Sequence, residues 1–187
     1  MKVLFIDTHM FDINIILFEN GEIKRQEQVI GKKQNSQYLL PTIDKVCQED
    51  IIDEVVVING PGSFTGVRLG VTVAKTYAYV KNIPIKVISY FDLMSYSVKE
   101  DNFILGISEN NGYYLAEYEN RKLINDYFYL SNNDYNIYIQ SHNVITNVSI
   151  DYNNLITSLK NISSVNPHVV KPLYIKHIEV ENVKKCN

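Results

Sequence analysis

The run Asn59-Gly60-Pro61-Gly62-Ser63-Phe64-Thr65-Gly66-Val67-Arg68-Leu69-Gly70 joins two different patterns in this chain. A β-branched run at residues 55–58 leads into it, and an apolar pattern with helical spacing at residues 67–80 leads out of it. Glycines and a proline between a buried strand and a helix predict a sharp turn that some other group approaches closely. That group could be a phosphate, a substrate or another protein.

The spacing of the glycines fits neither of the common nucleotide-binding fingerprints. A dinucleotide-binding loop needs glycine where Thr65 stands, and a Walker loop needs Gly-Lys-Ser or Gly-Lys-Thr where Gly66 is followed by Val67. An anion at the amino end of the following helix stays physically feasible, because free N–H groups and the helix dipole favour negative charge there. The spacing alone favours a tight structural turn over an anion site.

The helix expected after this loop is apolar around most of its circumference. Small residues recur at every fourth position and form a flat face that another helix could approach closely, at Gly66, Gly70, Ala74 and Ala78. Larger apolar residues form a second strip, at Leu69, Val73, Tyr77 and Val80. We expect such a helix to be buried on more than one side, by its own sheet and by the helix at residues 36–48, a partner protein or both. A central helix of a self-contained core accounts for the pattern equally well.

Composition limits the classes of function. The 187 residues are 45% hydrophobic and 21% charged, which is typical of a globular protein. A formal net charge of -3 and a pI near 5.8 argue against a protein that binds nucleic acid unaided. No apolar run approaches the ~18 residues that span a bilayer. The two cysteines, Cys47 and Cys186, form no C-x-x-C pair and predict reduced thiols in a cytoplasm.

The order of expected elements predicts an α/β protein of two lobes. Residues 1–99 read β-β-β-α-β-α-β-α, with strands at 2–6, 13–18, 23–30, 55–58 and 85–88 and helices at 36–48, 67–80 and 89–98. Residues 100–187 are more polar and form a smaller, strand-rich lobe, with strands at 103–108, 113–118, 123–130 and 135–140 and a helix at 155–161. The C-terminal segment could pack back on the first lobe.

Candidate catalytic residues are few. None of the spacings typical of a metal site occurs among the histidines, which stand at His9, His142, His168 and His177. Ser63 is not in a Gly-x-Ser-x-Gly elbow, so we expect it to cap the following helix rather than attack a carbonyl. Asp7 and Thr8 end the first strand, where sheets that handle nucleotides place a metal-orienting acid. A carboxylate that caps a turn is the commoner case.

The run from Gly60 to Gly70, followed by Ala74-Lys75, resembles the signature of the bacterial TsaB (YeaZ) proteins. Supporting matches are dense over residues 1–98 and thin afterwards, and comprise Leu4-x-Ile6-Asp7-Thr8, Ser36-Gln37-x-Leu39-Leu40-Pro41-x-Ile43-Asp44, Ile83-Pro84 and Pro172-Leu173-Tyr174-Ile175-Lys176. The chain departs from the family at Asn35, where histidine is common, and at residues 106–111, where Asp-Ala-Arg-Arg is usual. It is also short for the family, so we expect a trimmed second lobe.

The resemblance implies an ASKHA fold (the actin, sugar kinase and Hsp70 architecture) of two lobes, each around a mixed sheet. It also implies a non-catalytic, cytoplasmic subunit that binds TsaD and, with the ATPase TsaE, supports threonylcarbamoyl transfer from threonylcarbamoyl-AMP to the adenosine beside the anticodon of tRNAs that read A-starting codons. The family's first-lobe helices pack against TsaD, or against a second copy in a homodimer. The resemblance implies no cofactor of the chain's own, with ATP or ADP at the interface of the complex, and tRNA contact only through the complex.

The partner-binding residues that the resemblance implies lie in the loop and the two first-lobe helices. They are Ser36, Leu39, Leu40, Ile43, Gly60, Pro61, Gly62, Ser63, Phe64, Thr65, Gly66, Arg68, Leu69, Gly70, Val73, Ala74 and Tyr77. An alternative from a different class is an ASKHA-type ATPase or phosphotransferase that acts through Asp7 and Thr8. Magnesium-dependent ATP turnover by the isolated chain would discriminate between the two.

Overall fold

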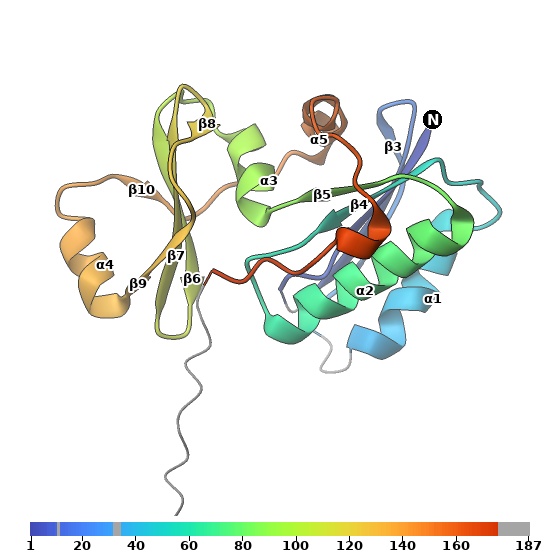
Figure 1. Cartoon of the computed structure of the whole chain (residues 1–187), viewed down its shortest axis with the longest axis horizontal. Helices are drawn as coiled ribbons and strands as arrows, with labels where there is room; N and C mark the ends of the chain where they lie inside the picture. The colour runs from blue at the N-terminus through green and yellow to red at the C-terminus, as the bar shows by residue number, and fades with distance from the viewer. Residues whose placement is uncertain (11, 32–34, 176–187) are drawn as a thin grey trace, which may run out of the picture.

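A computed structural model describes residues 1–10, 12–31 and 35–175 and has two lobes, each built on a five-stranded sheet (Figure 1). The first lobe contains β1 (Lys2–Asp7), β2 (Ile13–Glu19), β3 (Glu22–Val29), α1 (Asn35–Cys47), β4 (Glu54–Ile58), α2 (Phe64–Lys81), β5 (Ile85–Ile88) and α3 (Tyr90–Ser97). Its strand order is β3-β2-β1-β4-β5. The predicted order of elements in the first lobe is confirmed.

Local chemistry explains how the first sheet is built. Asn20 and Gly21, both with positive φ, turn β2 into β3, and the three first strands pair antiparallel. β4 and β5 are added in parallel to β1, because α1 and α2 carry the chain back to the starting edge of the sheet. The sheet is therefore mixed, as the ASKHA resemblance implies.

The first sheet is covered on both faces. On one face α1 and α2 lie side by side (Figure 1) and bury a core with alternate residues of the strands, among them Leu4, Ile6, Val55 and Val57. On the other face Phe5, Phe18 and Ile58 pack against α3 and α5 (Tyr152–Leu159). The central strands β1 and β4 are buried on both faces, which fits their continuous apolar sequence.

The second lobe differs from the prediction in three places, one of which is the unpredicted short strand at Val144–Ile145. Its sheet contains β6 (Phe103–Glu109), β7 (Gly112–Glu119), β8 (Lys122–Leu123), β9 (Phe128–Ser131) and β10 (Val144–Ile145). The single strand expected at 123–130 is two short strands, β8 and β9, that both pair with β7. The strand expected at 135–140 is wrong, because α4 (Asn132–Tyr138) begins there with Ser131 as its N-cap, which accepts a hydrogen bond from the Asp134 N–H. β10 pairs in parallel with β6, so this sheet is also mixed.

After β10 the chain returns to the first lobe. Leu155 and Leu159 of α5 are buried in the core on the α3 side of the first sheet. Val165 then bridges to Ile85 at the edge of the sheet, and the 3-10 turn η1 (Pro167–Val169) leads to residue 175. No helix in the described ranges is both long and apolar enough to cross a bilayer.

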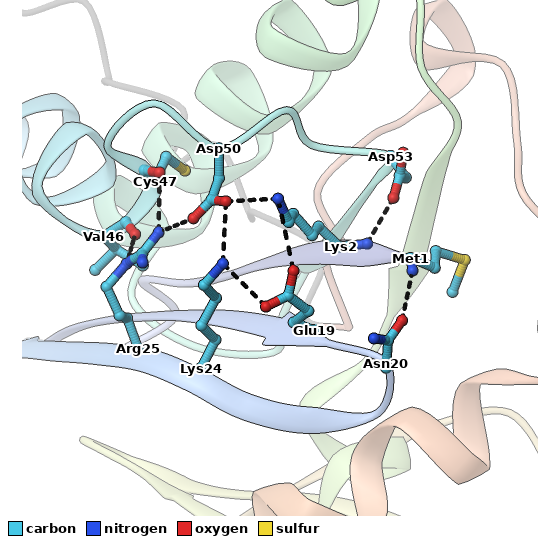
Figure 2. Close-up of polar contacts among 10 residues, drawn as sticks. All are labelled: Met1, Lys2, Glu19, Asn20, Lys24, Arg25, Val46, Cys47, Asp50 and Asp53. Carbon is cyan, nitrogen blue, oxygen red and sulfur yellow. Dashed lines mark hydrogen bonds and ion pairs between the residues drawn. The ribbon is translucent and has the colours of Figure 1, made fainter.

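A cluster of charges fastens α1 to the first hairpin. Asp50, just after α1, accepts from Lys2 Nζ at 2.6 Å and Lys24 Nζ at 3.1 Å, and it pairs with Arg25 (Figure 2). Arg25 also donates to the carbonyls of Val46 and Cys47 in the last turn of α1, at 2.6 and 3.1 Å. Three cations around one carboxylate hold the pKa of Asp50 well below its usual range.

Candidate partner-binding surface

The close neighbour of the glycine loop is the chain's own β1–β2 connection. The Ser63 N–H donates to the His9 carbonyl at 2.6 Å, and a Cβ on Gly62 would overlap that same carbonyl. A Cβ on Gly66 would overlap the Thr8 carbonyl. These glycines are therefore needed because two backbones touch, and the expected tight structural turn is what the structure contains.

The start of α2 follows from the same loop. The Ser63 hydroxyl accepts a hydrogen bond from the Gly66 N–H at 3.4 Å, so Ser63 caps the helix as the sequence predicts. The helix begins at Phe64, three residues earlier than its apolar pattern, and ends at Lys81. No acidic residue stands in its first turn. The amino end of α2 is consequently a region of positive potential.

Asp7 and Thr8 are both buried and both engaged in local bonds. Asp7 Oδ1 accepts from the His9 N–H at 3.0 Å and from the His9 ring at 2.6 Å. Thr8 Oγ1 donates to the Gly66 carbonyl at 2.7 Å. His9 also stacks on Tyr90, with ring centres 3.9 Å apart. No motif in the sequence marks His9 as a site residue. Together with Asp7 and Thr8, it holds the carboxyl end of β1 against α2 and α3.

The small residues of α2 face the sheet of their own lobe. Gly66, Gly70, Ala74 and Ala78 are buried, and a Cβ on Gly70 would overlap Thr8 Oγ1. The flat face that another helix was expected to approach is thus occupied by β1 and its neighbours. Gly66, Gly70 and Ala74 are therefore buried by the lobe's own packing and are not accessible on this chain, and their role in partner binding stays a prediction.

The other predicted partner-binding residues divide by exposure. Buried with the small residues are Leu39, Ile43, Gly60 and Pro61, and half-buried are Gly62, Ser63, Leu69, Val73 and Tyr77. Exposed to solvent are Ser36, Leu40, Phe64, Thr65 and Arg68. The structure therefore brings the residues of α1, α2 and the loop together on one side of the first sheet, but leaves only some of them accessible.

An accessible surface runs along the outside of α2. We call its members the outer ridge: Thr65, Leu69, Thr72, Val73, Thr76 and Val80. The three threonines and Val80 are exposed, whereas Leu69 and Val73 are half-buried and also pack against the core. Val80 is 70% exposed, and Leu40 of the adjacent α1 is 59% exposed. The thiol of Cys47 on α1 neighbours Tyr77 of α2. Leu40 lies two helical turns before Cys47 on the same side of α1, so Leu40 faces α2 as well. The outer ridge itself contains no acidic residue, but on α1 the exposed Asp44 lies one turn after Leu40 on the same side.

The other flank of α2 is covered by the C-terminal segment, residues 165–175, which we call the strap. Val170 is buried in the core, and Lys75 Nζ donates to its carbonyl at 3.2 Å. The Leu173 N–H donates to the Asn59 carbonyl at 2.7 Å. Tyr79 contacts His168 edge to face, with ring centres 4.8 Å apart. The strap residues were missed as site residues, and their one signal in the sequence is the Pro172-Leu173-Tyr174 match to the family.

The sequence of this chain is similar to those of proteins of tRNA threonylcarbamoyladenosine biosynthesis. A family model described as TsaD: tRNA N6-adenosine threonylcarbamoyltransferase matches residues 29–122, half of the chain. The tRNA threonylcarbamoyladenosine biosynthesis protein TsaB of Bacillus subtilis (strain 168) is 32% identical over 100 residues, which are 51% of this chain and 44% of that protein. The TsaB of Haemophilus influenzae is 26% identical over 137 residues, 68% of this chain and 58% of that protein. The chain belongs to the TsaD-like family, in its TsaB (YeaZ) branch.

Solved structures agree with the TsaB (YeaZ) assignment at the level of the fold. YeaZ from Pseudomonas aeruginosa superposes with a TM-score of 0.70 at 16% identity, over 92% of this chain and 99% of that one. A protein similar to peptidase YEAZ, also from P. aeruginosa, gives a TM-score of 0.72 at 16% identity, over 94% of this chain and 99% of that one. The expected α/β fold of two lobes, each with a mixed sheet, is confirmed and is shared with these YeaZ structures. The matched stretches cover about half the length of the two curated TsaB relatives.

Proposed function

We propose that this chain is a non-catalytic subunit of the machinery that makes threonylcarbamoyladenosine in cytoplasmic tRNA, and that it acts by binding TsaD. With TsaE, the complex would support transfer of the threonylcarbamoyl group to the adenosine beside the anticodon of tRNAs that read A-starting codons. Membership of the TsaB branch carries this proposal. Nucleotide and tRNA would meet the chain only through the assembled complex.

The proposed contact surface is the outer ridge of α2 together with Leu40 and Ser36 of α1. These residues are exposed or half-buried, and among them no acidic side chain would have to be desolvated, while Asp44 of α1 borders them one turn after Leu40. Two helices that lie side by side on one face of the sheet offer ridges against which two helices of a partner can pack. The same surface could serve a homodimer, which would compete with TsaD.

The geometry at Asp7 and Thr8 supports a scaffold more than an enzyme. Both acceptor bonds on Asp7 Oδ1 come from His9, and the Thr8 hydroxyl is bound to the Gly66 carbonyl. The backbones of residues 8–10 and of the glycine loop are in contact, so a phosphate could not lie between them without separating them. The structural bonds of Asp7 and Thr8 account for both side chains, which supports a scaffold over the ATPase alternative.

Co-purification and size-exclusion chromatography with the TsaD of the same organism test the proposal. We expect a heterodimer peak, and we expect Leu40→Glu and Thr72→Arg to shift it toward separate proteins because each places a charge in the apolar contact. Ile51→Glu is the matched control for Leu40→Glu, since Ile51 is 82% exposed and lies outside this surface. Separate peaks for the two folded wild-type proteins would refute TsaD binding.

A reconstituted system tests the role in modification. The full set of components should form threonylcarbamoyladenosine on tRNA only when this chain is present, and Asp7→Asn should retain that activity whenever the variant remains folded. Magnesium-dependent ATP hydrolysis by the isolated chain, abolished by Asp7→Asn, would instead support the enzymatic alternative.

A further inference from the structure

Arg68 is placed differently from the two other arginines of the chain. Arg25 donates to two carbonyls and a carboxylate, and Arg121 donates to the carbonyls of Ser95, Val98 and Glu100. Both therefore bind their own fold with their terminal nitrogens. Arg68 uses only Nε, which donates to the Tyr174 hydroxyl at 2.6 Å. Within residues 1–10, 12–31 and 35–175, its two terminal NH2 groups have no acceptor.

Two aromatic rings hold the Arg68 guanidinium in place. Its central carbon lies 3.5 Å from the centre of the Phe64 ring and 5.6 Å from that of Tyr174. The two rings are themselves in contact, with centres 5.6 Å apart. We call Phe64, Arg68 and Tyr174 the arginine clamp. Because one edge of the guanidinium is tied to Tyr174 and one face to Phe64, its remaining edge is oriented before any ligand arrives.

No described residue neutralises the charge of the clamp. Arg68 is in the second turn of α2, near the positive end of the helix dipole, and the first turn contains no acid. No carboxylate in the described chain lies within ion-pair distance of it. Two parallel N–H donors on a fixed plane match the two oxygens of a carboxylate or the oxygens of a phosphate. The clamp is therefore suited to an oxoanion.

The surroundings favour a carboxylate on a protein over a nucleic-acid phosphate. Phe64 is 45% exposed and Tyr174 46% exposed, and arginine among exposed aromatic rings is typical of the centre of a protein interface. A phosphate backbone is bound by clustered cations. On α2, Lys75 is already committed to the Val170 and His168 carbonyls, and Lys81 lies at the opposite end.

We propose that the arginine clamp receives one carboxylate of TsaD, bound by both terminal NH2 groups of Arg68, and that Tyr174 of the strap is a positioning residue for this contact. The inference rests on the proposed function, because the clamp adjoins Thr65 at one end of the outer ridge. The arginine clamp adds Tyr174, from the far end of the sequence, to the proposed contact surface. The strap thereby influences partner binding without lying on the outer ridge itself.

Isothermal titration calorimetry of the chain with TsaD, at low and at physiological ionic strength, tests the clamp. Arg68→Met should weaken binding about 30-fold or more and reduce its salt dependence. Arg68→Lys should weaken it roughly tenfold, because a lysine keeps the charge but cannot bind both oxygens in one plane. Lys122→Met is the control for the loss of one positive charge, since Lys122 is exposed in the second lobe, and it should bind like wild type.

Tyr174→Phe separates positioning from simple packing. It keeps the ring and removes the hydroxyl, so binding should weaken between about twofold and tenfold. In the Arg68→Met background the same change should have no further effect, because Tyr174 acts through Arg68. Additive effects of the two changes would refute the positioning role. Circular dichroism of each variant should match wild type, since all three clamp side chains are exposed.

The outcomes distinguish the clamp from the proposed function. A TsaD complex that is insensitive to Arg68→Met, or equally sensitive to Lys122→Met, would overturn the clamp and leave TsaD binding intact. No complex with the wild-type chain would overturn both. Binding of tRNA by the isolated chain that is lost in Arg68→Met would overturn the assignment of a protein carboxylate. To identify the carboxylate, each acidic residue of TsaD is replaced in turn by its amide, in combination with wild-type Arg68 and with Arg68→Met. The acidic residue whose replacement no longer weakens binding once Arg68 is changed is the one that Arg68 binds.

Discussion

The contact between Gly70 and Thr8 can be tested by a pair of substitutions whose effects should not add. A Cβ on Gly70 would overlap Thr8 Oγ1 and lie 3.5 Å from Thr8 Cβ. The overlapping atom also donates the 2.7 Å hydrogen bond to the Gly66 carbonyl. Gly70→Ala should therefore both overfill this site and disturb a buried hydrogen bond.

The expected magnitude follows from three contributions. Overfilling a close-packed site costs about 1–3 kcal/mol, and loss of the hydrogen bond costs about 1 kcal/mol. Replacing glycine by alanine inside a helix regains about 1 kcal/mol. Gly70→Ala should consequently lower the free energy of unfolding by about 1–3 kcal/mol. Thr8→Ala alone should lower it by about 1 kcal/mol or slightly more, through the same hydrogen bond and the small space it leaves.

The double variant gives the decisive result. Once Thr8 Oγ1 is absent, an alanine at position 70 meets no overlapping atom, so in the Thr8→Ala background Gly70→Ala should be neutral or stabilising by up to about 1 kcal/mol. Urea unfolding followed by circular dichroism measures all four proteins. Thr8→Ser is the control, because it retains the hydroxyl and should keep Gly70→Ala destabilising. Strictly additive effects would show that Gly70 does not pack on Thr8.

Three further predictions concern other parts of the first lobe. Hydrogen bonds from Lys2, Arg25 and Lys24 lower the pKa of Asp50 in the folded protein. Ionised Asp50 therefore stabilises the fold fully above its unfolded pKa of about 4, and this stabilisation is lost as the pH falls below that value. Asp50→Asn should make the midpoint of unfolding depend less on pH in this acid range. Burial raises the pKa of the Cys47 thiol to about 11, so in a Cys186→Ser variant, where Cys47 is the single cysteine of the sequence, a thiol reagent at pH 8 should react only at the rate of unfolding, and fast reaction of that native variant would contradict the burial of Cys47. Val170→Ala should lower the free energy of unfolding by about 1–3 kcal/mol in urea titrations, because Val170 is 4% exposed and anchors the strap in the core, whereas the 61% exposed Val169 should tolerate alanine.

Local patterns explain why the first lobe could be predicted. The Asn20-Gly21 turn, the β-branched run of β4 and the capping serines Ser63 and Ser89 each determine their element within a few residues. The second lobe has shorter strands and weaker signals. Residues 135–140 are rich in tyrosine and isoleucine, which favour strands. The Ser131 cap and the stacking of Tyr135 on Tyr113, at 3.6 Å between ring centres, nevertheless favour the helix α4. Tertiary contacts decided between two local readings that the pattern alone could not separate.

Site residues that depend on distant contacts could not be found from spacing. The role of Gly62 and Gly66 was predicted as a close approach, but the approaching group is the backbone of residues 8–10, more than fifty positions earlier. Tyr174 joins Arg68 across a separation of 106 residues. Neither pairing leaves a periodic signal, because each depends on how the sheet and the strap bring two segments together.

Contacts within the chain, including those of the strap, explain most of the apolar character of α2. The small side of the helix faces the sheet, Leu69, Val73 and Tyr77 pack against the core beside α1, and the strap covers the flank that holds Lys75 and Tyr79. Three of its sides are thus accounted for within the chain. An apolar circumference by itself therefore does not require a partner. What remains accessible on the described residues is a narrow ridge of exposed threonines and Val80, with Leu69 and Val73 partly exposed beside them. At its amino end lies Arg68, whose terminal NH2 groups have no acceptor in the described part of the chain. The ridge offers a partner contact area, and the oriented charge offers it a fixed orientation.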